Sequence, residues 1–219
     1  MSRKRLRAVI FGPQGSGKGT QGRLLAERFK VPLISAGDLF RAEIEENSEL
    51  GKLAKVYVEH GCLAPDELVN GIMSRQLKSL DLRHGFILDG FPRTVEQAAH
   101  LQRILPVNNA ILIKISDDLA VERLRYRLQC PKCRAVYNKT DARPAKPGRC
   151  SRCGAKLVRR SDDTEETIRM RLMNYHFMTE PMARLYRQKG ILLMVKGDQA
   201  INYVHMVLVR KLAKLGFVP

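Results

Sequence analysis

A glycine-rich segment near the N-terminus constrains this chain most. Residues 12–20, GPQGSGKGT, follow an apolar run at 8–11 and precede a helical pattern at 21–29. Closely spaced glycines let the backbone curl so that several N–H groups converge on one anion at a helix start. Lys18 adds a mobile charge that can follow a β- or γ-phosphate. The segment predicts a phosphate-binding P-loop; a glycine-rich turn with an incidental lysine is the alternative.

Apolar runs and helical patterns alternate along most of the 219 residues. We predict strands at Arg7–Phe11, Leu33–Ser35, 85–88, 109–115 and 191–195. This alternation favours a parallel sheet covered by helices on both faces. A later helical run should continue to about residue 188, with Met178 on its apolar face and a kink at Pro181. Asp163 and Glu166 are spaced as a capping box at its start.

A second segment, FILDGFPRT at 86–94, ends a predicted buried strand in Asp89. Ligands of α/β folds bind at the carboxyl ends of the strands, so Asp89 is placed to hold Mg²⁺ or its waters beside the P-loop. A helix-capping role is the alternative for Asp89, but it leaves the following GFPR unexplained. Gln97 should expose a carboxamide able to read a base edge; a plain surface glutamine is the other interpretation.

Four of the five cysteines form two Cys-x-x-Cys pairs with sixteen residues between them, namely Cys130, Cys133, Cys150 and Cys153. This spacing is typical of a closed, structural zinc site, and the segment holds no histidine. Reduced cysteines without a metal are the alternative, and disulfides are less favoured in a cytosolic chain. The fifth cysteine, Cys62, is expected to be a small apolar residue.

Positive charge is concentrated in two places. The chain carries +17, and residues 123–160 hold thirteen Lys or Arg against one acid. The N-terminal arm adds four more, which leaves the rest close to neutral. We expect the surplus charge to make ATP affinity fall with ionic strength, through exposed residues such as Lys139, Arg143 and Lys146. A solvated basic face with no effect on nucleotide binding is the alternative.

A basic pair of cysteine knuckles is also typical of nucleic-acid-binding zinc ribbons. Arg41 and Arg93 argue against that class, because such a protein needs no second phosphate cradle. No apolar run approaches the roughly 18 residues of a membrane span, and the run after the N-terminal arm is shorter than a signal-peptide core of about 7–15 residues. We therefore expect a cytoplasmic protein without membrane or nucleic-acid partners, as a monomer.

Together these segments resemble the adenylate kinases of the long bacterial type, whose lid is a zinc-holding insertion. The resemblance covers nearly the whole chain. It implies an α/β fold: a three-layer α/β/α P-loop core with a parallel five-stranded sheet at 1–34, 65–126 and 164–219. A helical NMP-binding domain would occupy 35–64, and a small zinc-containing β lid 127–163. The implied reaction is reversible transfer of the γ-phosphoryl of ATP, bound with Mg²⁺, to AMP, giving two ADP.

The resemblance also implies roles for single residues. The ATP phosphates would lie on Gly15, Ser16, Gly17, Lys18, Gly19 and Thr20, and the ATP adenine near Arg123, Val136, Tyr137 and Gln199. AMP would contact Ala36, Arg41, Cys62, Leu63, Ala64, Gly90, Phe91, Pro92, Arg93 and Gln97. Arg127, Arg160 and Arg171 would close over the transferring phosphoryl and its nucleotides, together with the catalytic residues Lys18, Asp89 and Arg93.

Gly19 separates Lys18 from the hydroxyl of Thr20, whereas most P-loops carry Ser or Thr directly after the lysine. This form of the loop resembles that of the nucleoside monophosphate kinases. Two other positions depart from the adenylate kinase pattern. Ala36 stands where adenylate kinases usually have Thr, as in UMP/CMP kinases, and Ala64 replaces a more usual Val. Gln97 is the adenine-type residue, and UMP/CMP kinases are similar to the form without the long lid. AMP is thus the favoured acceptor and UMP/CMP kinase the alternative.

Overall fold

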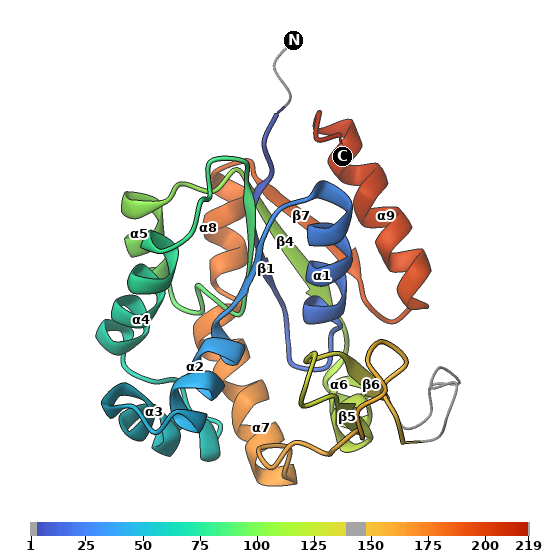
Figure 1. Cartoon of the computed structure of the whole chain (residues 1–219). Helices are drawn as coiled ribbons and strands as arrows, with labels where there is room; N and C mark the ends of the chain where they lie inside the picture. Colours follow the sequence, from blue (N-terminus) through green and yellow to red (C-terminus); the bar gives the residue numbers. More distant parts are fainter. Residues whose placement is uncertain (1–3, 139–147, 219) are drawn as a thin grey trace.

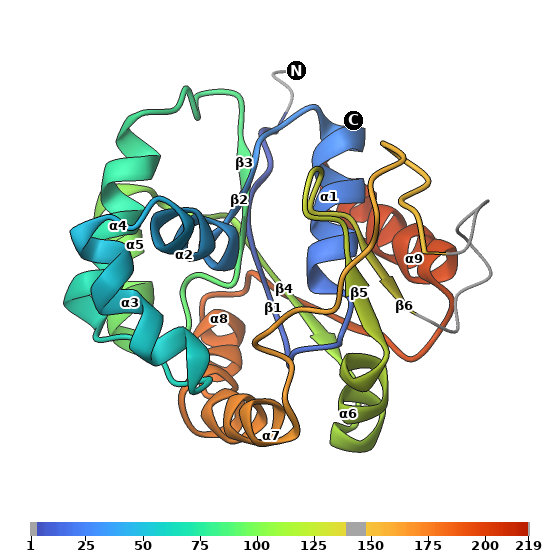
Figure 2. The ribbon, with the colours of Figure 1, turned by 60° about the horizontal axis from the view of Figure 1, so that its bottom comes forward.

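The computed structural model describes residues 4–138 and 148–218. Within these residues, five strands form one parallel sheet in the order β2-β3-β1-β4-β7. Figure 1 labels β1, β4 and β7 of this sheet, and Figure 2 labels β2 and β3. The strands are β1 (Arg7–Phe11), β2 (Leu33–Ser35), β3 (Phe86–Asp89), β4 (Asn109–Lys114) and β7 (Leu192–Lys196). Each end lies within one residue of the predicted position. The prediction of a parallel α/β sheet is confirmed.

Helices cover both faces of this sheet, which explains why its central strands are continuous apolar runs. On one face, Ala8 and Ile10 of β1 pack in a core with Leu25 and Leu208, from α1 (Lys18–Phe29) and α9 (Ile201–Lys214). On the other face, Val9 belongs to the core of α4 (Asp66–Lys78), α5 (Val95–Ile104) and α8 (Met182–Gln188). Alternate residues of one strand thus serve opposite layers.

Two further units lie beyond the carboxyl ends of the strands (Figure 2). One consists of α2 (Ala36–Glu45) and α3 (Glu49–Glu59), which the side chains of Ser35 and Ser48 cap. The other pairs β5 (Arg127–Gln129) with β6 (Val136–Asn138) above α6 (Asp117–Arg125), around its own small core. Lys139, Arg143 and Lys146, singled out for their charge, lie outside the described residues. No helix in the described ranges is long and apolar enough to cross a membrane.

The C-terminal helical run differs from the prediction. α7 (Glu165–Asn174) ends in a π-helical turn, η1 (Tyr175–Thr179), and α8 begins after Pro181. The interruption thus starts before the proline. A π turn holds one more residue than an α turn, so it shifts the apolar stripe. Met178 is 44% exposed instead of buried, and Thr179 is buried in its place.

The predicted capping box is also wrong. Thr164 caps α7, accepting a hydrogen bond from the N–H of Thr167. The carboxylate of Asp163 instead accepts hydrogen bonds from two arginines, as described below.

Candidate active site

A cavity of about 680 Å³ opens at the carboxyl ends of the strands, between the P-loop, the α2–α3 unit and the β5–β6 unit. Nearly all the residues named from the resemblance line it. They are Gly15, Ser16, Gly17, Lys18, Gly19, Thr20, Ala36, Arg41, Cys62, Leu63, Ala64, Asp89, Gly90, Arg93, Gln97, Arg123, Arg127, Val136, Tyr137, Arg160, Arg171 and Gln199. Phe91 and Pro92 do not: Phe91 is buried in the sheet core, and Pro92 lines a small neighbouring pocket. Cys62, expected to be a plain apolar residue, is exposed.

The P-loop connects β1 to α1, as its flanking sequence predicts. Gly17 is the residue before the helix, with φ of 87°, a left-handed conformation that glycine adopts without strain. It has no side chain to cap the helix, so the first N–H groups of α1 remain available for an anion. Lys18 opens the helix, and its Nζ donates to the Pro13 carbonyl oxygen at 3.3 Å.

Lys18 and Asp89 lie close together and are partly buried in the wall of the cavity. Burial lowers the pKa of Lys18 to about 8; Asp89 opposes this shift, and Arg93 adds to it. Burial also raises the pKa of Asp89, against the opposing charge of Lys18. A Cβ on Gly19 would lie only 3.1 Å from the Asp89 Oδ2. A Ser or Thr directly after the lysine would therefore crowd this carboxylate, which would have to shift by a few tenths of an ångström.

The side chains beside Lys18 and Asp89 are suited to binding a hard cation. The buried Oδ1 of Asp89 has no hydrogen-bond partner among the described residues. Thr20, on the first turn of α1, lines the same cavity. Carboxylate and hydroxyl oxygens are ligands that suit Mg²⁺, directly or through water.

Two neighbouring aspartates organise the arginines of the site. Asp163 accepts two hydrogen bonds from Arg127, one of them from Nε to Oδ2 at 2.7 Å, and a third from Arg171 at 3.3 Å. Asp162 accepts two parallel hydrogen bonds from Arg160, at 2.9 and 2.8 Å, and a third from Nη2 of Arg171 at 2.5 Å. Sequence reasoning missed this role of both aspartates and predicted a capping box for Asp163 instead. The available signal was an acidic pair between Arg160 and Arg171 in a strongly basic segment.

These contacts leave an excess of buried positive charge. Burial alone would raise the pKa of Asp162, but Arg160 and Arg171 hold it far below its usual range. Burial, together with the charge of Arg171, lowers the pKa of Arg93 to about 10. Burial and the charge of Arg160 also lower the pKa of Arg127. Cations that depress each other's pKa favour a polyanion between them.

The backbone of Arg93 is fixed from both sides. Its N–H donates to Gln97 Oε1 at 2.8 Å, and its carbonyl accepts from Thr179 Oγ1 at 2.9 Å. Its Nε donates to the Gly90 carbonyl at 2.8 Å. Gln97 is only 1% exposed, and its Nε2 donates to Asp66 Oδ1 at 2.7 Å. The expectation of an exposed carboxamide is therefore wrong, although Gln97 does line the cavity. The π-helical turn is what brings Thr179 to Arg93, a contact that sequence reasoning missed.

Arg41 lies across the cavity on α2. Its Nη2 donates to Asp38 Oδ1 at 2.6 Å, while its buried Nε has no hydrogen-bond partner among the described residues. Burial and the charge of Arg160 lower the pKa of Arg41. Ala36, at the start of the same helix, is buried, and Ala64 packs against the sheet core.

The residues expected near the ATP base lie at the end of the cavity opposite Arg41. Nη1 of Arg123 donates to the carbonyls of Gly197 at 2.8 Å and Gly15 at 3.3 Å, which ties α6 to the P-loop. The Tyr137 ring is largely buried in the β5–β6 core, and its hydroxyl lies 2.9 Å from Ser151 Oγ. Val136 and Gln199 are exposed at the cavity.

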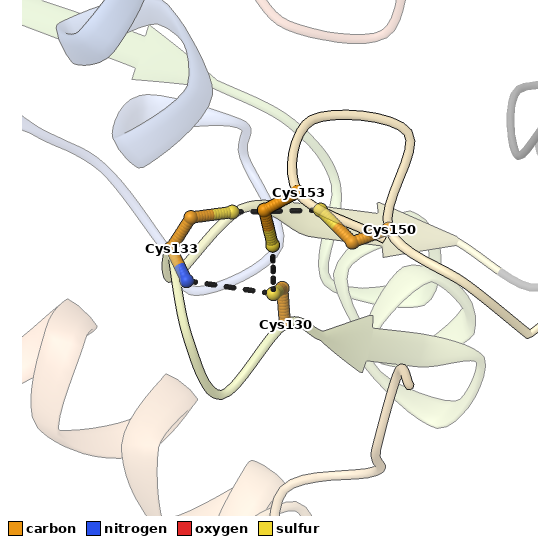
Figure 3. Close-up of side chains that lie close together, drawn as sticks. All are labelled: Cys130, Cys133, Cys150 and Cys153. Carbon is orange, nitrogen blue, oxygen red and sulfur yellow. Dashed lines mark hydrogen bonds between the residues drawn. The ribbon is translucent and has the colours of Figure 1, made fainter. Parts of the chain in front are cut away.

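The four cysteines converge as their spacing predicts (Figure 3). Their Sγ atoms all lie within 4.8 Å of one another, and two pairs, Cys130–Cys153 and Cys133–Cys150, are 3.4 Å apart. A tetrahedral zinc with bonds of about 2.3 Å separates its sulfurs by about 3.8 Å. Four thiols so close, with no disulfide among them, fit such an ion.

Comparison with known proteins agrees with this site. The family model described as "Adenylate kinase" matches residues 10–191. A protein named adenylate kinase from Moorella thermoacetica is 42% identical over 214 residues, 95% of this chain and 99% of its own length. Those from Symbiobacterium thermophilum and Clostridium perfringens are 42% and 41% identical, and each alignment covers at least 90% of both chains. The cavity, its phosphate-binding loop and the extent of these matches together establish that the chain belongs to the adenylate kinase family.

Proposed function

We propose that this protein transfers the γ-phosphoryl of ATP to AMP, reversibly, giving two ADP. One observation carries the proposal: a single cavity holds two separate sets of cations that face a shared arginine cluster. Lys18 and the P-loop form one set, and Arg41 and Arg93 the other. Such a site suits two phosphorylated ligands placed end to end. The family and the names of the relatives support adenine nucleotides as those ligands.

In this proposal the P-loop residues, Gly15 to Thr20, bind the ATP phosphates, while Arg123, Val136, Tyr137 and Gln199 surround its base. Arg41 and Arg93 grip the AMP phosphate, and Ala36, Cys62, Leu63, Ala64 and Gly90 surround its base. Gln97, whose carboxamide is engaged by Arg93 and Asp66, holds the wall of this subsite in place. Phe91 and Pro92 shape the loop that carries Arg93. Asp89 and Thr20 would hold Mg²⁺, which when bound supplies positive charge to the ATP phosphates.

The chemistry requires positioning more than proton transfer. The acceptor is a phosphate oxygen, which is largely ionised at pH 7 because its second pKa is about 6. No general base is therefore needed. Arg127, Arg160 and Arg171 stabilise the charge that spreads over the transferring group, where a single arginine can be worth roughly 10³–10⁵ in rate. Asp162 and Asp163 hold these guanidinium groups in place before substrate arrives.

We further propose that 35–64 and 127–163 act as mobile domains closing on the core, which excludes water from ATP. The four cysteines hold a structural Zn²⁺, because a closed four-thiolate site leaves no position for substrate. Both nucleotide subsites lie within one chain, so we infer a monomer. A site of free thiols suits the reducing cytoplasm.

A coupled assay of ADP formation across AMP, GMP, UMP and CMP tests the proposal. AMP should be the best acceptor, and Arg93→Ala should lower kcat/KM for AMP sharply while ATP binding stays near that of wild type. Faster turnover of UMP or CMP would replace the assignment with UMP/CMP kinase. No transfer to any of the four, with tight RNA binding, would favour the zinc-ribbon alternative.

A further inference from the structure

One backbone conformation in the β5–β6 unit is unexpected. Arg134 directly follows the first Cys-x-x-Cys pair and has φ of 57°, in the left-handed region that side chains disfavour. Gly154 holds the same place after the second pair, with φ of 75°. The two turns match: Arg134 N–H donates to Cys130 O at 3.0 Å, and Gly154 N–H to Cys150 O at 2.9 Å. Glycine would form the first turn without strain.

The arginine side chain does something that glycine cannot. Its Nη2 donates to both carboxylate oxygens of Glu45, at 2.8 and 3.0 Å. Glu45 is the last residue of α2, and 88 residues separate the pair along the chain. The Arg134 carbonyl also accepts from Nη2 of Arg23 on α1 at 3.3 Å. One strained residue therefore contacts both the α2–α3 unit and the core.

We propose that Arg134 is a positioning residue that latches the β5–β6 unit to α2, so that ATP binding and AMP binding reinforce each other. The inference rests on the proposed function, in which the two units close over different nucleotides. The Arg134–Glu45 pair forms only where the two units meet. It therefore stabilises the doubly closed conformation and leaves each separately closed conformation without that contribution.

The solvent exposure of the Arg134–Glu45 pair sets the size of the expected coupling. The Arg134 side chain is 30% exposed and that of Glu45 60%, so water screens the pair and its contribution is modest. We expect a coupling of about two- to five-fold between the nucleotides. Coupling is reciprocal, so bound ATP should increase the affinity for AMP by the same factor as bound AMP increases the affinity for ATP.

The test uses Arg134→Gly and Glu45→Gln in the full-length, zinc-loaded enzyme. The probe is a bisubstrate inhibitor, two adenosines joined by a pentaphosphate, which occupies both subsites. By calorimetry, each variant should bind it about two- to five-fold more weakly than wild type does, and bind ATP alone as wild type does. The double variant should be no weaker than either single variant. Arg134→Glu combined with Glu45→Arg should restore affinity.

Arg152→Gln is the matched control, because Arg152 lies in the other knuckle and pairs with Glu27 of α1 at 3.7 Å. It should leave inhibitor affinity unchanged. Arg134→Gly should also keep its zinc and unfold no more readily, since it relieves the strained turn. Unchanged inhibitor affinity, or equal weakening of ATP alone, would overturn the latch. If the wild type phosphorylates AMP and the variants bind the inhibitor as tightly as the wild type does, only the latch is wrong. If the wild type does not bind the inhibitor, the proposed function is wrong as well.

Discussion

Raising the pH should weaken ATP capture by the free enzyme through Lys18. Burial brings the pKa of this lysine down to about 8, so its ammonium starts to lose its proton in a mildly alkaline range where an ordinary lysine stays charged. The neutral amine cannot attract a phosphate. The expected loss therefore appears in kcat/KM for ATP, which reports ionisations of the free enzyme.

The structure sets the size of this loss. With a pKa of about 8, roughly one lysine in eleven is still protonated at pH 9, so kcat/KM for ATP should fall about ten-fold between pH 7 and pH 9. Moving the pKa back to the ordinary value of 10.5 corresponds to about 3 kcal/mol. Bound phosphates can supply that interaction, because opposite charges at close range raise a lysine pKa. Once ATP is bound, kcat should stay flat.

Initial rates from pH 6.5 to 9.5, at constant ionic strength, provide the measurement. Saturating ATP supplies an internal control: kcat/KM for AMP should then show no fall near pH 8, because Lys18 is already paired with phosphate. Arg93 does not interfere, since its pKa of about 10 lies above this range. A kcat/KM for ATP that stays level up to pH 9.5 would refute the reasoning. So would an equal fall in kcat.

Thr179→Val removes the donor to the Arg93 carbonyl; we expect the unfolding free energy to drop by about 1–2 kcal/mol, or roughly 2–8 °C in Tm, and KM for AMP to rise, with Thr179→Ser as the control that should stay near wild type. Asp162 has a folded pKa below its unfolded value of 3.8, so its stabilisation is complete above about pH 5 and is lost as the pH falls further. Asp162→Asn should therefore reduce the fall of the unfolding free energy below about pH 5, measured by urea unfolding. An unchanged dependence of that free energy on pH would contradict this. Elemental analysis should find one zinc per chain, and Cys150→Ser should lower Tm; metal-free protein purified without chelator would exclude the site.

Local patterns were enough to predict the sheet and the P-loop. Each strand is a short apolar run, because both faces of the sheet are covered, and the runs end near glycine or polar residues. The cysteine pairs were equally clear, since each knuckle is a local turn and only the meeting of the two is long-range. In these cases the sequence signal and the structural cause lie within a few residues of each other.

The remaining features depend on contacts between distant segments. Gln97 looks like a surface residue of an amphipathic helix, and only Asp66, 31 positions earlier, explains its burial. Asp163 has the spacing of a helix cap, but Arg127 competes for its carboxylate from another element. The π turn is hidden in the apolar pattern, because Tyr175, Met178 and Met182 keep spacings of three and four that also fit a regular α-helix. Arg134 looks like one more surface cation until Glu45 is placed opposite it.

The wide turn between α7 and α8 also sets a rotational phase. Each residue of an α-helix turns the chain by about 100°, so the additional residue in η1 rotates α7 by that angle relative to a regular helix continuing from α8. The core fixes α8 through Met182 and Tyr186, whereas α7 carries Arg171 toward the cavity. Deleting one residue from Tyr175–Thr179 would therefore leave the hydrophobic packing of α8 intact and point Arg171 away from Asp162.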